Sequence, residues 1–332
     1  MALSAVALRK GLFAASLGMV LAAAVFVPLP LVELSPGPTF DVPAVVRFTG
    51  HEIHPVKGKL LATTVLESRP SATDALGAWL GSHHELLREE QVVPRGVNER
   101  QYNEAQLRLF DESALVGAAV GLRAAGLPVS ATGQGAQVVA VIRGSPASGR
   151  LRPGDVVTAV DGRPVGLASD LVTATSGAKA GARVTLSVRR GGTARDVTLV
   201  LRPVSELGRP ALGVSVVSLA PRVDLPFEVK VNVSDVGGPS AGLMVALATY
   251  ELATPTELLH GRVVAGTGTI DLAGNVGPIG GIGEKVAAAE RDGATLFLAP
   301  AEEAADARAA AGSHLAVVPV RTFADALAAL KR

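Results

Sequence analysis

The sequence predicts a multidomain α/β protein, and three contrasting segments support this prediction. Near the N-terminus, residues 11–32 form a run without a charged side chain. The middle of the chain alternates short apolar runs with glycine and proline turns, which is typical of a β-rich domain. Residues 204–332 connect strand-like and helix-like runs through glycine-rich loops, which indicates an α/β domain.

Composition narrows the range of functions. The 332 residues are enough for two or three domains with a sizeable core. The formal net charge is +1 and aromatic residues make up 3%, so we expect no nucleic-acid partner. The absence of cysteine excludes disulfides, thiolate metal sites and cysteine catalysis. We predict no metal site and no cofactor.

The apolar run predicts a membrane anchor over residues 11–32. A helix needs about 20 apolar residues to cross a bilayer. Arg9 and Lys10 come just before the run, which favours residues 1–10 in the cytoplasm and the rest outside. A cleaved signal peptide is the alternative, but the run is longer than the usual apolar core of such peptides.

Residues 33–125 are predicted to form a separate juxtamembrane α/β extension of unassigned role. Short apolar runs predict strands over 44–48 and 59–65. Helical spacing predicts helices over 72–80 and 98–125.

Residues 126–203 are predicted to form a β-rich domain. Gly191-Gly192 separates two runs that predict a hairpin, 184–190 and 196–201. A strand is predicted over 137–142 and a short helix over 167–176. The stretch GSPASGRLRPGDVVTAVDGRPV, from Gly144 to Val165, resembles PDZ domains in the strand order of bacterial envelope proteases.

That resemblance implies a groove between the predicted strand and helix, where a peptide would add as an extra strand. The groove residues implied in this way are Gly135, Gln137, Val138, Val139 and Leu171.

The stretch GGPSAG places Ser240 between a strand-like run, 228–233, and a helix-like run, 243–252. It matches the G-x-S-x-G pattern of α/β-hydrolases. The remaining triad members would be Asp292 and His314, but only 92 residues follow the serine, which leaves little room for that fold.

A serine–lysine pair explains the pattern better. Lys285 follows a glycine-rich turn and lies in the first turn of a predicted helix over 284–290, where the helix dipole disfavours a cation. Burial would lower its pKa further, and a neutral lysine could then accept the proton of Ser240. Backbone N–H groups next to Ser240, at the start of the helix that follows it, could hold the oxyanion of a tetrahedral intermediate.

The two blocks GGPSAG and AGTGTIDLAGNVGPIGGIGEKVAAAERDGA closely resemble the proteolytic domain of Lon-type serine proteases (family S16) over residues 210–332. The resemblance implies Ser240 as nucleophile, Lys285 as general base and Thr267 as the residue that orients the lysine. It implies a substrate and oxyanion loop formed by Gly237, Gly238, Pro239 and Ala241. Relatives often carry an acid where this chain has Gly237, and the missing acid would either help to keep the lysine neutral or alter how the site opens.

The whole layout resembles membrane-anchored PDZ–Lon proteases of bacterial envelopes. The 332 residues contain no G-x-x-x-x-G-K-[ST] phosphate loop. The implied function is ATP-independent serine endopeptidase activity on unfolded or flexible protein segments, at the outer side of the bacterial cytoplasmic membrane. The implied partners are protein or peptide substrates, the membrane, a PDZ peptide ligand and further copies in a hexameric ring. A PDZ scaffold with an inactive protease-like domain is the alternative.

Overall fold

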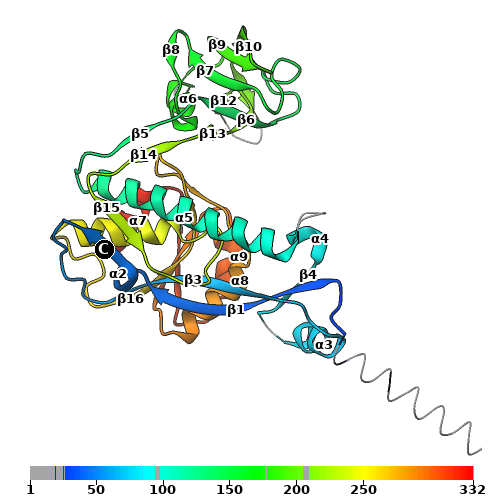
Figure 1. Cartoon of the computed structure of the whole chain (residues 1–332), viewed down its shortest axis with the longest axis vertical. Coiled ribbons are helices and arrows are strands. Elements are labelled where there is room, and N and C mark those ends of the chain that lie inside the picture. The colour runs from blue at the N-terminus through cyan, green and yellow to red at the C-terminus, as the bar shows by residue number, and fades with distance from the viewer. Residues whose placement is uncertain are drawn as a thin grey trace, which may run out of the picture. The chain divides into compact units, whose positions relative to one another are not determined.

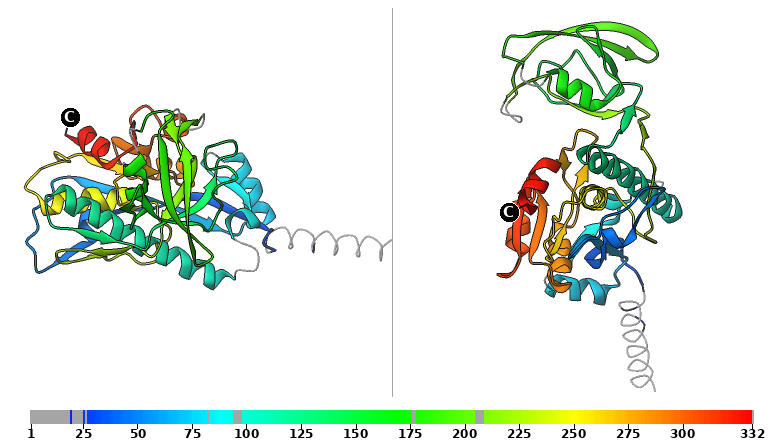
Figure 2. Two further views of the ribbon diagram at one scale, coloured as in Figure 1. Left: turned by 90° about the horizontal axis from the view of Figure 1, so that it is seen from above. Right: turned by 90° about the vertical axis from the view of Figure 1, so that its left-hand side faces the viewer.

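The computed structural model of the chain (Figures 1 and 2) describes residues 19 and 25 and the ranges 27–81, 83–93, 98–175, 178–204 and 209–331. The chain folds into two compact units. One is Leu127–Pro226, and the other joins the chain before Leu127 to the chain after Pro226. Leu127–Pro226 is therefore an insertion within the larger unit.

The larger unit is built on a six-stranded mixed sheet in the order β20-β19-β16-β3-β1-β4. The four strands β3, β16, β19 and β20 run parallel. At one edge, β1 pairs antiparallel with β3, and β4 pairs antiparallel with β1. The strands are β1 (Leu31–Asp41), β3 (Lys59–Ser68), β4 (Glu85–Arg88), β16 (Val263–Gly266), β19 (Leu296–Pro300) and β20 (Ala316–Val320). Two short pairs flank the sheet, β2 (Val46–Thr49) with β15 (Glu228–Val231) and β17 (Thr269–Ile270) with β18 (Val276–Gly277).

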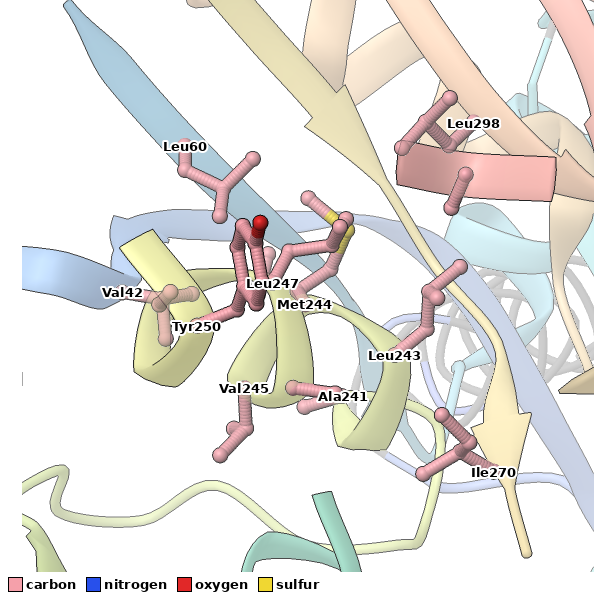
Figure 3. Packing of buried hydrophobic residues seen from close by; sticks show 14 of the residues in the cluster. Val42, Leu60, Ala241, Leu243, Met244, Val245, Leu247, Tyr250, Ile270 and Leu298 are labelled. Carbon is pink, nitrogen blue, oxygen red and sulfur yellow. The ribbon is translucent and has the colours of Figure 1, made fainter. Parts of the chain in front are cut away.

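Side chains alternate between the two faces of this sheet, and each face has its own core. Leu60 and Leu298 pack with α7 (Gly242–Ala253) on one face, as Figure 3 shows. Leu61 and Phe297 pack with α8 (Ile282–Arg291) on the other. The remaining helices of this unit are α2 (Val42–Val45), α3 (Ala72–Leu80), α4 (Glu89–Val92), α5 (Glu99–Ala124), α9 (Ala304–Ala310) and α10 (Phe323–Leu330).

The long helix α5 packs closely against α7 (Figure 1). A Cβ atom on Gly117 would lie 2.5 Å from the carbonyl oxygen of Gly242, and Gly121 meets the backbone of Ala246 in the same way. Glycine at both positions therefore allows the two backbones to approach.

The structure corrects the prediction of a separate extension over 33–125. The local predictions there are largely confirmed: α3 and α5 match the expected helices, and β3 covers the strand expected over 59–65. The strand expected over 44–48 is partly replaced by α2, and β2 begins at Val46. These elements belong to the same sheet and core as the C-terminal part, because β3 pairs with β16 about 200 positions along the chain.

Most of the predicted anchor, residues 11–32, lies outside the described residues. Its far end is corrected by the structure, because Leu31 and Val32 are the first residues of β1 and Val32 is buried. Among the residues that the structure describes, no helix is both long and apolar enough to span a membrane.

The inserted unit has a sheet in the order β10-β9-β7-β6-β13, with β8 paired to β7. Its core lies between this sheet and α6 (Ala168–Thr175), and the hairpin predicted around Gly191-Gly192 is confirmed. The strands of the sheet are β6 (Ala136–Val141), β7 (Val156–Val160), β8 (Arg163–Pro164), β9 (Arg183–Arg190), β10 (Thr193–Val200) and β13 (Val214–Ser218). The other pairs in this unit are β5 (Ser130–Thr132) with β14 (Arg222–Asp224), and β11 (Arg202–Val204) with β12 (Arg209–Ala211).

Candidate active site

Ser240 lies in the turn between β15 and α7, and α5 fixes the shape of that turn. Ser113 Oγ donates a hydrogen bond to the carbonyl oxygen of Pro239 at 2.7 Å. Gly238 N donates to the carbonyl oxygen of Gln106 at 2.8 Å. Two contacts from one helix thus hold the residues on the N-terminal side of the serine.

The residues after β16 hold Ser240 from the other side. Its carbonyl oxygen accepts hydrogen bonds from Gly268 N at 2.8 Å and from Thr267 Oγ1 at 3.1 Å. Thr267 is fully buried and follows the carboxyl end of β16, the edge of parallel sheets where ligands usually bind.

Lys285 is the fourth residue of α8, which begins at Ile282, two residues before the predicted start. Its side chain is only 3% exposed, and Nζ donates a hydrogen bond to Thr267 Oγ1 at 3.4 Å. Burial lowers the pKa of Lys285 from 10.5 to about 8, although the carboxylates of Glu303 and Glu284 oppose that shift. Roughly a tenth of such amines are neutral at pH 7.

Ser240 and Lys285 line the same cavity, whose volume is about 460 Å³. β3 and α5 supply another part of its wall. The residues that line the cavity are Pro38, Thr63, Thr64, Val65, Leu66, Glu67, Tyr102, Asn103, Gln106, Ser234, Asp235, Val236, Gly237, Ser240, Ala241 and Lys285. A buried amine and a serine therefore line one cavity that is large enough for part of a peptide chain.

Comparison with protein families identifies two domain types in this chain. Residues 230–330 match the family described as "Lon protease (S16) C-terminal proteolytic domain". This segment is a Lon-type proteolytic domain. Residues 120–201 match the family described as "PDZ domain", so the chain combines both domain types.

Curated relatives of the Lon-type domain include Lon protease of Campylobacter concisus, which is 34% identical over 110 residues, or 32% of this chain and 13% of that protein. Lon protease 1 of Herpetosiphon aurantiacus is 41% identical over 93 residues, or 27% of this chain and 11% of that protein. The chain therefore matches only a small part of the length of these relatives.

Among solved structures, the PDZ domain of an SdrC-like protein from Listeria monocytogenes is 24% identical, with a TM-score of 0.24. The match covers 26% of this chain and 90% of that one.

The match to the Lon-type family begins at residue 230, but the compact unit that contains it also includes the chain before Leu127. β1, β3 and α5 come from before the PDZ domain, and β3 and α5 supply one wall of the cavity. Sequence reasoning missed this wall, including Glu67 and Tyr102, because no local motif marks it. Tyr102 Oη donates to Glu67 at 3.2 Å, and burial together with that carboxylate raises the pKa of Tyr102 to about 12.

The predicted substrate loop is placed partly as expected. Gly237 and Ala241 line the cavity, whereas Gly238 and Pro239 are not among its lining residues. Gly238 has a φ of +82°, which favours glycine, and its N–H is already bonded to α5. A Cβ atom on Gly237 would lie 2.7 Å from Cβ of Gln106, so this glycine allows close packing against α5.

Acidic groups act on Lys285 even though Gly237 replaces the acid of many relatives. Glu303 is half-buried and accepts hydrogen bonds from Ile279 N at 3.1 and 3.2 Å, in the loop that leads to α8. Desolvation raises the pKa of Glu303, while the nearby Lys285 lowers it. The expectation that a missing acid keeps the lysine neutral is therefore incomplete, because burial is the main cause.

The predicted PDZ groove needs correction. β6, which carries Gln137, Val138 and Val139, is an inner strand paired with both β7 and β13, so it offers no free edge to a peptide. Gly135 N donates to Gly166 O, and Leu171 is buried in the core of the unit. The strand at the end of the sheet beside α6 is β13, from a part of the chain that was assigned to the next domain.

Proposed function

We propose that the chain is an ATP-independent serine endopeptidase in which Ser240 is the nucleophile and Lys285 the general base. The observation that carries the proposal is the buried position of Lys285 in the cavity that Ser240 also lines. A lysine with a pKa of about 8 is neutral often enough near neutral pH to accept a proton. The 332 residues contain no phosphate-loop motif, which supports a reaction without ATP.

In the proposed reaction, Ser240 Oγ attacks the carbonyl carbon of the scissile peptide bond while its proton moves to Lys285 Nζ. Collapse of the tetrahedral intermediate breaks the C–N bond, and the Lys285 ammonium returns that proton to the departing amine. Water then attacks the acyl-enzyme, and Lys285 accepts the water's proton. Release of the carboxyl product returns that proton to Ser240 Oγ, which restores both residues.

The open edge of β3 favours an extended substrate. β16 pairs with β3 only from Lys59 to Ala62, whereas β1 follows the other edge of β3 to Ser68. Residues 63–67 line the cavity beyond the last pair with β16. A peptide that adds to this edge would place its backbone along the cavity wall, and only an unfolded or flexible segment has a free backbone for such pairing.

We also propose attachment to the outer side of the bacterial cytoplasmic membrane. The support is the sequence alone, namely the uncharged run that precedes β1 and the basic pair Arg9 and Lys10 before it.

The test is digestion of casein by the full chain in detergent, without ATP. We expect Ser240→Ala and Lys285→Ala each to lower the rate by at least about 100-fold. The matched controls are Ser234→Ala, a serine that lines the same cavity, and Lys230→Ala, an exposed lysine. Both controls should keep the wild-type rate.

An acylating probe provides the second readout. Wild type should be labelled on Ser240, and Lys285→Ala should be labelled much more slowly. A fully active Lys285→Ala variant would rule out the dyad, and a wild type that neither cuts casein nor reacts with the probe would favour the scaffold alternative.

A further inference from the structure

Helix α3 presents its large apolar side chains to the outside. Leu76, Trp79 and Leu80 are 56%, 74% and 71% exposed. Their spacing of three and four residues places them on one face of the helix. The residues that α3 turns toward the rest of the unit are small: Ala78 is buried and Ala75 is half-buried. This is the reverse of the usual distribution in a water-facing helix.

The helix is hydrogen-bonded at both ends, and at its C-terminus Gly81 N donates to the carbonyl oxygen of Gly77 at 2.8 Å. Ser71 caps it, with the Ser71 side chain accepting from Asp74 N and the Asp74 side chain accepting from Ser71 N. Asp74 is the only charged residue in α3, and the capping box uses it. The outward face therefore combines exposed leucine and tryptophan side chains with no charge beyond the cap.

The position of α3 in the chain supplies an independent indication. Leu29 N donates to the carbonyl oxygen of Pro70 at 2.8 Å, and Pro28 bridges to Ser71, the cap of α3. Val27, just before this contact, is 56% exposed, and the uncharged run of the sequence leads directly into it. The start of α3 is thus held next to residues 27–29, where the uncharged run of the sequence leads into the folded unit (Figure 1).

We propose that α3 lies in the interfacial layer of a lipid bilayer, with Trp79 at the level of the headgroups and Leu76 and Leu80 against the acyl chains. Tryptophan favours this layer because its ring is apolar while its N–H can reach water. The inference extends the proposed membrane attachment and does not depend on the catalytic assignment. Since the helix carries no basic residue, contact depends on apolar burial and not on anionic lipid.

Trp79 is the only tryptophan in the chain, so its fluorescence reports on α3 directly. The experiment uses the full chain reconstituted in phosphatidylcholine vesicles, with or without bromine atoms on the acyl chains near the headgroups. Bromine quenches an indole that it contacts. We expect brominated lipid to reduce Trp79 emission by roughly half, because an interfacial tryptophan lies at that depth. Raising the salt to about 0.5 M should leave the quenching unchanged.

The control moves the reporter within the same unit. Trp79→Phe/Ile53→Trp places the indole at a half-exposed apolar position in the loop between β2 and β3. That variant should show little quenching. In a third variant, Leu76→Ser/Leu80→Ser, quenching of Trp79 should fall by at least about half, since most of the apolar contact is lost.

Two results would overturn the proposal. One is equal quenching, or none, at positions 79 and 53 in vesicle-bound protein. The other is a blue-shifted Trp79 emission that brominated lipid does not quench, which would show that another protein surface covers α3. Flotation of the protein with vesicles is measured separately, so a failure of the anchor is distinguishable from a failure of α3 to dock.

Discussion

The Nζ atom of Lys285 lies 3.4 Å from Oγ1 of Thr267, and that hydroxyl donates its own proton to the carbonyl oxygen of Ser240. Because the threonine proton is already used, Oγ1 can only accept from the lysine. One N–H of the amine is thereby oriented toward Thr267. The lone pair of a neutral amine must then point in another direction, so Thr267 would be a positioning residue in the proposed reaction.

The first prediction concerns this hydroxyl. Thr267→Val keeps the volume but removes the acceptor, so we expect kcat/KM to fall about 10- to 100-fold. Loss of a hydrogen bond that favours the ammonium form should also lower the pH midpoint of activity. Thr267→Ser should restore the rate and the midpoint. A lower rate with an unchanged midpoint would indicate that Thr267 only supports the fold.

The second prediction is the pH dependence of the wild type. Burial lowers the pKa of Lys285 to about 8, and only the neutral amine accepts a proton. We therefore expect kcat/KM to rise about tenfold per pH unit below that value and to level off above it. Cleavage of a short fluorogenic peptide between pH 6 and pH 10 measures this. A rate that rises only near the pKa of a free lysine would contradict the assignment.

The third prediction concerns Glu303, whose negative charge raises the pKa of Lys285. Glu303→Gln removes the charge and keeps a side-chain oxygen that can accept from Ile279 N. The midpoint of the pH–rate profile should therefore move to lower pH. Glu302→Gln, at an exposed neighbouring position, is the matched control and should leave the midpoint where it is. Identical midpoints in both variants would exclude an electrostatic role for Glu303.

Local patterns were sufficient for much of this structure. Helix α5 follows from side-chain spacing over 98–125 and α7 from the apolar run 243–252, and both signals lie within the helices that they predict. The blocks around Ser240 and Lys285 are local in the same sense. Thr267 also contacts Ser240 and Lys285 in the structure.

What the sequence could not show was pairing between distant segments. β3 pairs with β16, although the PDZ domain is inserted between them in the sequence. The sequence of a strand that is buried on both faces does not indicate which strand it pairs with. For that reason the wall formed by β3 and α5 was assigned to a separate extension. The same difficulty affected β13, which follows β12 in the chain but forms the end strand of the PDZ sheet, next to β6. The charge of Glu303 acts on Lys285 through space and has no sequence signature at all.

The fourth prediction links the base to stability. The pKa of Lys285 falls from 10.5 in the unfolded chain to about 8 in the folded one, so burial of this ammonium costs about 3 kcal/mol below pH 8. Between these two pKa values the unfolded chain binds the extra proton, so the free energy of unfolding rises with pH and the cost disappears. Lys285→Met should therefore raise Tm at pH 7.

The gain from Lys285→Met should shrink as the pH approaches 10. Thermal unfolding at several pH values measures the difference from wild type, and Lys230→Met, at an exposed position, serves as control. A gain that does not change with pH would show that packing, and not the buried charge, explains it.

The fifth prediction tests the contact between α5 and α7. Gly117→Ala would place a methyl group 2.5 Å from the carbonyl oxygen of Gly242, so the helices must separate, and we expect a loss of about 1–3 kcal/mol in the free energy of unfolding. Gly77→Ala is the matched control, because Gly77 is also inside a helix but has open space around it. There the higher helix propensity of alanine should stabilise the chain by up to about 1 kcal/mol.

Activity should differ between Gly117→Ala and Gly77→Ala in the same direction as stability. α5 holds the turn before Ser240 through Ser113 and Gln106, so a shift of α5 caused by Gly117→Ala moves the supports of the proposed nucleophile. We expect kcat/KM to fall about tenfold or more in Gly117→Ala, because small displacements of reacting groups are costly, and to stay unchanged in Gly77→Ala. Urea unfolding and peptide cleavage on the same samples measure both effects. If Gly117→Ala were as stable and as active as Gly77→Ala, the close approach of the two helices would not be what holds Ser240 in place.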